Sequence, residues 1–219
     1  MTSDPSGQLL SLLSHELRSP LGVIRGYLRM LDDPSGSLTA QQRQAVAAAM
    51  RAADQAAHLL GQASFLAQLR RGETQWNPST VDVRALVEAA SQSARTFDAP
   101  VTCVIGEIAV RNVAASLDQL RGALASFIAA VARAQVPPTP ITITGLRRQH
   151  DDRDGLSLRI ERPRDGSQPS ERALNMSRGG LGLDLPIAEA IIAAHGGLVT
   201  ELLDGGRWVG VVVWLPATS

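Results

Sequence analysis

The sequence predicts an α+β protein that consists of a helical hairpin followed by an α/β sandwich. Apolar residues recur at helical spacing through the first third of the chain, and period-two alternation marks short strands in the second half. With 219 residues, of which 44% are hydrophobic and 19% charged, the chain can bury one or two cores. We therefore expect a helical hairpin over residues 1–71, a linker over residues 72–80 and the α/β domain over residues 81–219.

The hairpin is predicted from two apolar stripes. On the first helix, Leu10, Leu17, Ile24 and Leu31 recur every seven residues, and Leu13, Leu21 and Leu28 fill the positions between them. Thr39 to Gln42 has the pattern of a capping box, which opens a second helix that runs to about Arg71. Its stripe is formed by Val46, Met50, Ala53, Ala57, Leu60, Ser64 and Ala67. Because two helices alone cannot bury both stripes, we expect a homodimer with a four-helix bundle.

The α/β domain is predicted to place helices on one face of a mixed sheet. Ser116 to Gln119 is a second capping-box pattern. Expected helices span residues 83–94, 117–134 and 186–194, and expected strands span residues 101–105, 108–113, 141–146, 156–162 and a hairpin over 198–215. This arrangement is a two-layer α/β sandwich.

Composition excludes several kinds of function. All 21 basic residues are Arg, so a Schiff-base lysine and a P-loop lysine are excluded. The balanced charge, without an Arg-rich stripe, argues against nucleic-acid binding. The single Cys103 excludes an intrachain disulfide and a multi-thiolate metal site. Apolar stretches are too short for a membrane span, so we expect no membrane partner and a cytoplasmic location.

The segment from Ser14 to Leu21 holds the candidate catalytic residues. If Leu10 and Leu17 face the bundle, His15 faces solvent, with Glu16 beside it and with Arg18 and Ser19 on the same outward surface. A neutral imidazole is a capable nucleophile, and a neighbouring carboxylate can orient it or accept its proton. The alternative is an ordinary surface histidine on a bundle helix.

A second group of residues predicts a docking surface on the same helix. Gly22 and Gly26 lie beyond His15, and each glycine costs about 1 kcal/mol in a helix interior relative to Ala. Glycines beside an exposed histidine suggest that a partner approaches this backbone closely. We therefore predict that Gly22, Arg25 and Gly26 form a partner-docking surface.

The chain resembles the catalytic core of two-component sensor histidine kinases. Ser14 to Leu21 is similar to the phosphoacceptor motif of their dimerisation and histidine-phosphotransfer domain. Gly180 to Leu185, followed by His195-Gly196-Gly197 and by the closing Trp214-Leu215-Pro216, resembles the end of their ATP-binding domain. The resemblance implies that His15 is the phosphoacceptor, Glu16 its acid-base neighbour, Ser19 a residue used in dephosphorylating a partner, and Pro20 a helix kink.

The nucleotide site implied by this resemblance is degenerate. Ala130 stands where the family has a Mg²⁺-binding Asn, and Ser126 replaces another Asn. Arg162 stands where the family has an Asp that reads adenine, and Asp184 replaces a phosphate-binding glycine, which leaves Gly180 and Gly182 as vestiges. We therefore expect no cofactor and no metal site in the chain itself.

Three functions are compatible with these residues. The first is a histidine phosphotransferase, similar to the ChpT-like kinase-derived proteins, that relays phosphoryl groups between response-regulator receiver domains, with Mg²⁺ supplied by the receiver. The second is an ATP-dependent histidine autokinase with an atypical nucleotide site. The third is a non-catalytic pseudokinase that dimerises with or sequesters partners.

Overall fold

The chain forms two compact units, one before and one after the junction of Thr74 and Gln75, in a computed structural model. The described residues are 5–32, 38–74, 78–96, 99–133, 140–162, 183–204 and 207–217. Within these ranges, the backbone alone is described for residues 5–15, 95–96, 99–100 and 207.

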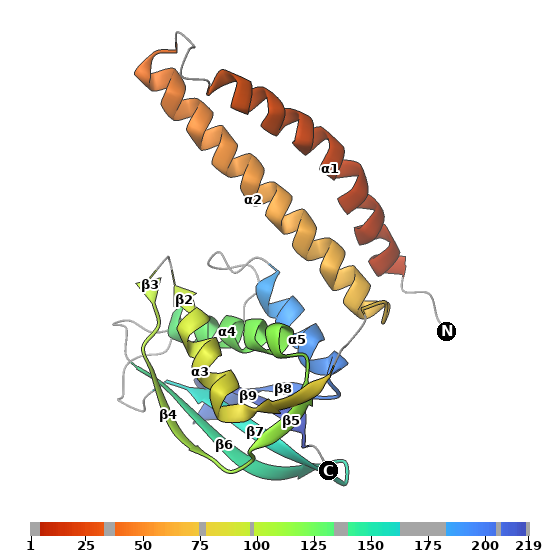
Figure 1. Cartoon of the computed structure of the whole chain (residues 1–219), viewed down its shortest axis with the longest axis vertical. Helices are drawn as coiled ribbons and strands as arrows, with labels where there is room; N and C mark the ends of the chain where they lie inside the picture. The colour runs from red at the N-terminus through yellow and green to blue at the C-terminus, as the bar shows by residue number, and fades with distance from the viewer. Residues whose placement is uncertain are drawn as a thin grey trace. The chain divides into compact units, whose positions relative to one another are not determined.

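The first unit is a hairpin of two long helices, α1 (Pro5–Leu31) and α2 (Ala40–Arg70) (Figure 1). The predicted capping box at the start of α2 is confirmed. Thr39 Oγ1 accepts a hydrogen bond from the backbone N–H of Gln42 at 3.2 Å, and Gln42 Oε1 accepts one from the backbone N–H of Thr39 at 2.8 Å. Because these bonds satisfy N–H groups that lack partners at a helix start, local sequence sets where α2 begins.

The stripe of α2 agrees with the prediction, since all its members are buried or half-buried. They are Val46, Met50, Ala53, Ala57, Leu60, Ser64 and Ala67.

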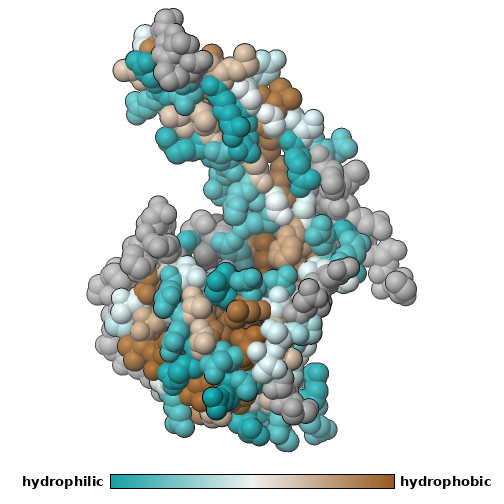
Figure 2. All heavy atoms as spheres, in the orientation of Figure 1, coloured by the Kyte–Doolittle hydropathy of each residue, from teal (hydrophilic) through white to brown (hydrophobic). Residues whose placement is uncertain are grey.

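The predicted stripe of α1 is covered only in part by the hairpin itself. Leu21, Arg25 and Leu28 are half-buried, whereas Leu17, Ile24 and Leu31 are 46%, 48% and 49% exposed. A hairpin buries one stripe on each helix, so the seven-residue repeat stays uncovered in the single chain. These three residues belong to a wide α1 apolar face, which consists of Leu17, Val23, Ile24, Tyr27, Met30 and Leu31. Figure 2 shows brown, hydrophobic atoms reaching the surface of the hairpin.

The second unit is built on a five-stranded sheet in the order β4-β6-β7-β9-β8. The β4–β6 pair is parallel and the other pairs are antiparallel. The strands are β4 (Cys103–Ile108), β6 (Ile141–His150), β7 (Arg153–Glu161), β8 (Leu198–Asp204) and β9 (Arg207–Pro216). Three helices cover one face of this sheet (Figure 1): α3 (Val83–Ser93), α4 (Leu117–Arg133) and α5 (Asp184–Ala194). The α+β prediction is therefore confirmed.

The core of the second unit lies between these helices and the sheet. Helix α4 contacts β6, β7 and β9. Phe127 and Leu124 of α4 and Ile143, Leu158 and Val213 of these strands are each at most 1% exposed. Burying one large apolar side chain contributes about 1.5–3 kcal/mol. This unit is therefore stabilised by a core of its own.

Two antiparallel pairs flank the main sheet. β1 (Ser79–Asp82) pairs with β5 (Asn112–Ala115), and β2 (Arg95–Thr96) pairs with β3 (Ala99–Pro100). The sequence reading missed β1, the start of which lies in the expected linker. The strand is short, and its partner is distant in sequence, so no local pattern marks it.

The β6–β7 hairpin is longer than predicted. The expected turn covered residues 149–155, but the strands continue until Asp151 and Asp152 alone make the turn. Both residues have positive φ, 46° and 57°, as a two-residue turn of the type favoured in hairpins requires. Aspartate tolerates this conformation better than most residues, but the preferred Asn-Gly or Asp-Gly signal is absent.

The tip of this hairpin packs against the last strand. Trp214 of β9 is 4% exposed, and a Cβ on Gly155 would lie 2.4 Å from its indole ring. The indole N–H donates to the carbonyl oxygen of Arg148 at 3.0 Å, and the Arg153 guanidinium lies 5.6 Å from the ring centroid. Trp214 and the buried Trp208 are packing residues, as expected. Trp76 lies outside the described residues.

The start of α4 and the end of α5 are joined through His195. Its Nε2 accepts the backbone N–H of Ser116 at 3.0 Å, and its Nδ1 lies 2.8 Å from the carbonyl oxygen of Ile191. The ring satisfies a donor at one helix start and an acceptor near another helix end.

Among the described residues, no helix combines the length and the apolar character that crossing a membrane requires.

Candidate phosphotransfer site

The candidate nucleophile His15 lies in the middle of α1, and the structure describes its backbone but not its side chain. Since an α-helix turns about 100° per residue, positions 22 and 26 fall almost in line with position 15, about two and three turns further on. Pro20 lies inside α1, between His15 and these glycines. The helix therefore places the histidine and the two glycines along one line of its surface.

Three predicted neighbours of His15 are exposed residues of the same helix. Glu16, Arg18 and Ser19 all face solvent in the single chain. Arg18 and Ser19 follow His15 by three and four positions, which are the spacings that bring helix positions onto one surface. A guanidinium and a hydroxyl thus flank the histidine position on a surface that a partner can reach, whereas Glu16, its neighbour in sequence, lies in line with Val23 and Tyr27.

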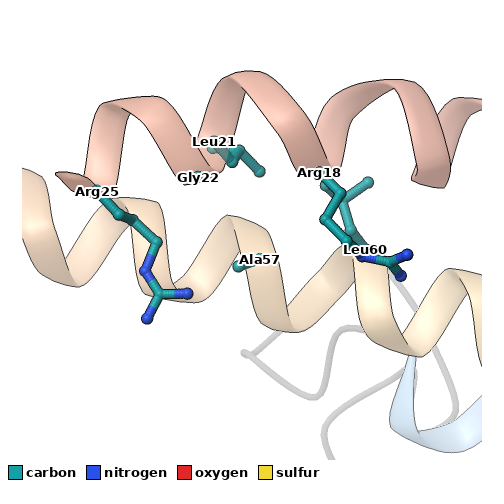
Figure 3. Close-up of a pocket in the computed structure, with 6 residues that line it drawn as sticks. All are labelled: Arg18, Leu21, Gly22, Arg25, Ala57 and Leu60. Carbon is teal, nitrogen blue, oxygen red and sulfur yellow. The ribbon is translucent and has the colours of Figure 1, made fainter.

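A pocket opens between α1 and α2 close to this surface. Its volume is about 240 Å³, and it is lined by Arg18, Leu21, Gly22, Arg25, Ala57 and Leu60. We call this pocket the α1–α2 groove. Figure 3 shows Arg18 and Arg25 at its two ends and Leu21 between the helices. Because Arg18 follows His15 by one helical turn, the groove begins beside the candidate nucleophile.

One arginine of the groove is paired across the hairpin. Arg25 Nε lies 2.9 Å from Asp54 Oδ1 of α2, and the two side chains are 38% and 56% exposed. Among the described residues of the hairpin, the ion pairs are Arg25–Asp54 and Arg71–Glu73, and Arg18 belongs to neither. The groove therefore carries one neutralised and one uncompensated guanidinium.

The fold itself does not require glycine at positions 22 and 26. A Cβ added to either residue would meet no atom within 4 Å. Both glycines also have helical backbones without positive φ. They cost helix stability relative to alanine, and the helical Gly61 and Gly122 have equally open surroundings. The docking surface at Gly22, Arg25 and Gly26 therefore stays a prediction.

Sequence reasoning missed the α2 side of the site. Asp54 was not considered, and Ala57 and Leu60 were assigned only to the helix-packing stripe. Ala57 and Leu60 could have been found from that stripe, because its edge also faces a groove. The Arg25–Asp54 pair could not, since it depends on how α1 and α2 are aligned along their lengths.

The positions of the implied nucleotide site lie in the second unit. Ala130 is 2% exposed in α4, and Ser126 donates its hydroxyl hydrogen bond to the carbonyl oxygen of Gly122 at 3.1 Å. A buried methyl group offers no oxygen for Mg²⁺, and the hydroxyl of Ser126 bonds its own helix.

Arg162 directly follows β7, and its backbone N–H donates to the carbonyl oxygen of Val209 at 3.0 Å. The residue is 7% exposed, and its Nε has no hydrogen-bond partner within the described ranges. A guanidinium has only N–H donors and no acceptor. It therefore cannot accept a hydrogen bond from an adenine amino group, as a carboxylate would.

Asp184 is the first residue of α5, and it is half-buried. A carboxylate at a helix N-terminus interacts favourably with the helix dipole, and it repels a phosphate from the same place. Gly180 and Gly182 lie outside the described residues. In the described ranges no group of three or more His, Cys, Asp or Glu residues could hold a metal ion.

Two pKa values depart from their ordinary range through burial. Burial raises the pKa of the Cys103 thiol, although a hydrogen bond with Ser91 opposes the effect. Burial also raises the pKa of Glu189, a carboxyl group on α5. Neither residue lies in the first unit, so they do not belong to the candidate phosphotransfer site.

The first unit matches a sequence family, and almost the whole chain is similar in fold to solved structures. Residues 6–72 match the family model of the His Kinase A (phospho-acceptor) domain. The fold of the chain is similar to the crystal structure of full-length ShkA in complex with AMPPNP, with a TM-score of 0.68 and 24% sequence identity. That likeness covers 98% of this chain and 47% of the ShkA chain, so the chain spans about half the length of that protein.

A second similar structure is the Acinetobacter baumannii histidine kinase AdeS, with a TM-score of 0.55 and 16% identity over 94% of this chain and 98% of that one. No curated protein matches the sequence. The chain therefore combines a hairpin of the His Kinase A phospho-acceptor type with a histidine kinase-like fold over almost its whole length.

Proposed function

We propose that the chain is a histidine phosphotransferase that relays phosphoryl groups between receiver aspartates of response regulators through His15, without ATP. A ring nitrogen of His15 attacks the phosphorus of a receiver aspartyl phosphate. A P–N bond forms, the P–O bond to the aspartate breaks, and the carboxylate leaves. The reverse reaction transfers the phosphoryl group to the aspartate of a second receiver. The receiver supplies Mg²⁺.

The observation that carries this proposal is the contrast between the two candidate sites. The phosphoacceptor surface on α1 keeps an uncovered Glu16, Arg18 and Ser19, and it adjoins a groove. At the implied nucleotide site, the described positions hold the methyl group of Ala130 and the donor-only side chain of Arg162. Phosphoryl transfer between proteins needs alignment and charge neutralisation, which the first surface can supply without the second.

The residues around His15 have separate roles in this reaction. Glu16 orients the imidazole or accepts its proton, because a carboxylate stabilises the form of the ring that attacks. The Arg18 guanidinium interacts with the oxygens of the transferred phosphoryl group. Ser19 serves a phosphatase reaction toward the receiver, as the resemblance implies.

We further propose that the protein acts as a homodimer. The α1 apolar face contains six large side chains that the single chain leaves exposed, and a soluble helix stabilises such a face by packing it against another helix. A second copy of the hairpin completes a four-helix bundle. His15 lies off this face, because its position is aligned with Gly22 and Gly26.

The test compares two phosphoryl donors for the purified chain. One is labelled ATP with Mg²⁺, and the other is a labelled, phosphorylated receiver domain. We expect label on the chain from the receiver only, and none with His15→Gln. Label on His15 from ATP in the absence of any receiver would contradict the proposal.

The second candidate is an ATP-dependent autokinase, and the likeness to ShkA, which was crystallised with AMPPNP, favours it. It predicts saturable nucleotide binding to the second unit and label from ATP on His15. A non-catalytic partner role predicts instead that His15→Ala retains function in the cell, whereas both enzymatic functions predict its loss.

A further inference from the structure

The two helices of the hairpin carry more arginines than carboxylates, although the whole chain is neutral. Helices α1 and α2 contain the arginines Arg18, Arg25, Arg29, Arg43, Arg51 and Arg70 and only two carboxylates, Glu16 and Asp54. Lys+Arg and Asp+Glu are equal at 21 each over the full sequence. A partner that docks on the hairpin is therefore favoured if its surface is acidic.

The groove concentrates this charge around an apolar floor. Leu21, Ala57 and Leu60 line it with carbon, and Gly22 adds no side chain. Arg18 and Arg25 stand at its two ends (Figure 3). This arrangement fits a segment that places a small apolar side chain between the helices and a carboxylate at an end.

The Arg25–Asp54 pair occupies one of these ends in the free protein. Its 2.9 Å contact lies at the surface, where both side chains are more than one-third exposed. Exposed ion pairs contribute little to folding stability. The pair can therefore exchange its carboxylate for another at small cost, which a buried pair could not.

We propose that Asp54 occupies, in the free protein, the place on Arg25 that a carboxylate of the receiver domain takes in the complex. When the receiver binds in the groove, its carboxylate displaces Asp54 from Arg25. The inference rests on the proposed function and specifies which surface the receiver uses. Asp54 then lowers the affinity for every receiver, because each must displace it from Arg25. Receivers that present an acidic residue opposite Arg25 regain the ion pair and are therefore preferred.

The experiment uses the full chain and the receiver domains of its source organism, with binding measured by calorimetry at low and high salt. Asp54→Asn removes the competing charge and keeps the shape, so we expect about twofold to fivefold tighter binding and a steeper salt dependence. Arg25→Gln is expected to weaken binding about fivefold or more. Asp54→Asn added to Arg25→Gln should then have no further effect.

Two control variants change net charge outside the groove. Asp32→Asn removes an exposed carboxylate beyond the end of α1, and Arg51→Gln removes an exposed guanidinium of α2. If Asp54→Asn changes affinity no more than Asp32→Asn, or weakens binding, the inference is wrong. The inference is also wrong if Arg25→Gln weakens receiver binding no more than Arg51→Gln does.

Phosphoryl transfer separates this inference from the function on which it rests. A wild-type chain that accepts label from a receiver but binds it independently of Asp54 and Arg25 contradicts the docking inference alone. A wild-type chain that accepts no label from any phosphorylated receiver contradicts both.

Discussion

The hairpin and the α/β domain differ in how far they bury their large apolar side chains. In the α/β domain, large side chains such as Phe127 and Leu158 are completely buried between helices and sheet. In the hairpin, Ile24, Tyr27 and Met30 are 48%, 65% and 74% exposed. One unit therefore buries its large apolar side chains by itself, whereas the other leaves an apolar face that, in our proposal, a second copy covers. The same contrast applies to the proposed function, since the uncovered unit carries the candidate phosphoacceptor His15.

The largest expected effect tests the self-sufficient core. Phe127→Ala should destabilise the α/β domain by about 3–5 kcal/mol, because it leaves a cavity at a fully buried position. Tryptophan fluorescence can follow this unit, since Trp208 and Trp214 are buried in it. Leu203→Ala, at a residue that is 56% exposed, is the control and should change stability by less than about 0.5 kcal/mol. Similar losses in both variants would contradict a core centred on α4.

The next effect tests whether the α1 apolar face is an interface. Ile24→Asp should convert a dimer into monomers at micromolar concentration, because it places a charge on a surface that the dimer would dehydrate. Sedimentation velocity measures the change. Val104→Asp alters a similarly exposed apolar residue, 54% exposed, in the α/β domain and should leave the dimer intact. A wild-type chain that sediments as a monomer would remove the premise.

A smaller effect tests the docking surface without altering the fold. Gly22→Leu and Gly26→Leu should leave a folded dimer, since each new side chain begins in open space. Transfer from a phosphorylated receiver should fall about tenfold or more, because the side chain blocks close approach, which corresponds to about 1.4 kcal/mol. Gly122→Leu in α4 is the matched control, as its Cβ also meets nothing within 4 Å. Unchanged transfer rates in both hairpin variants would contradict the docking surface.

The smallest effect concerns a carboxyl group of the α/β domain. Glu189 is an exposed residue, but partial desolvation of its carboxyl group raises the pKa in the folded protein, so folding slightly favours the protonated form. That contribution is fully present below the unfolded pKa and is lost as pH rises through the folded pKa. Glu189→Gln should therefore raise Tm slightly at neutral pH and not at pH 4. The same substitution at the exposed Glu88 of α3 is the control. An equal change at both pH values would exclude this explanation.

The parts of the fold that local pattern determines could be predicted. The capping box at Thr39 and Gln42 and the helix-packing stripe of α2 depend on near neighbours in sequence, and both are confirmed. β1 could not be predicted, because it is stabilised by pairing with β5, about thirty residues away. How the α1 stripe divides could not be predicted either: Leu21 and Leu28 are half-buried in the hairpin, whereas the seven-residue repeat stays exposed in the single chain.

The candidate site also has a part that local sequence predicts and a part that it does not. His15, Glu16, Arg18 and Ser19 come from one short motif, and the helix keeps them within about one turn of each other. Asp54, Ala57 and Leu60 enter the groove from the other helix. Their participation depends on interhelical alignment, which no single-sequence pattern encodes.

The indole of Trp214 occupies the space that a side chain at residue 155 would need, and its N–H donates to the carbonyl oxygen of Arg148 on β6, two strands away. The tip of one hairpin and the last strand of the domain therefore share a single intrinsic chromophore. Loosening at either segment alters the surroundings of that ring, so its emission wavelength can monitor the rim of the α/β domain in a variant in which Trp76 and Trp208 are replaced by Phe.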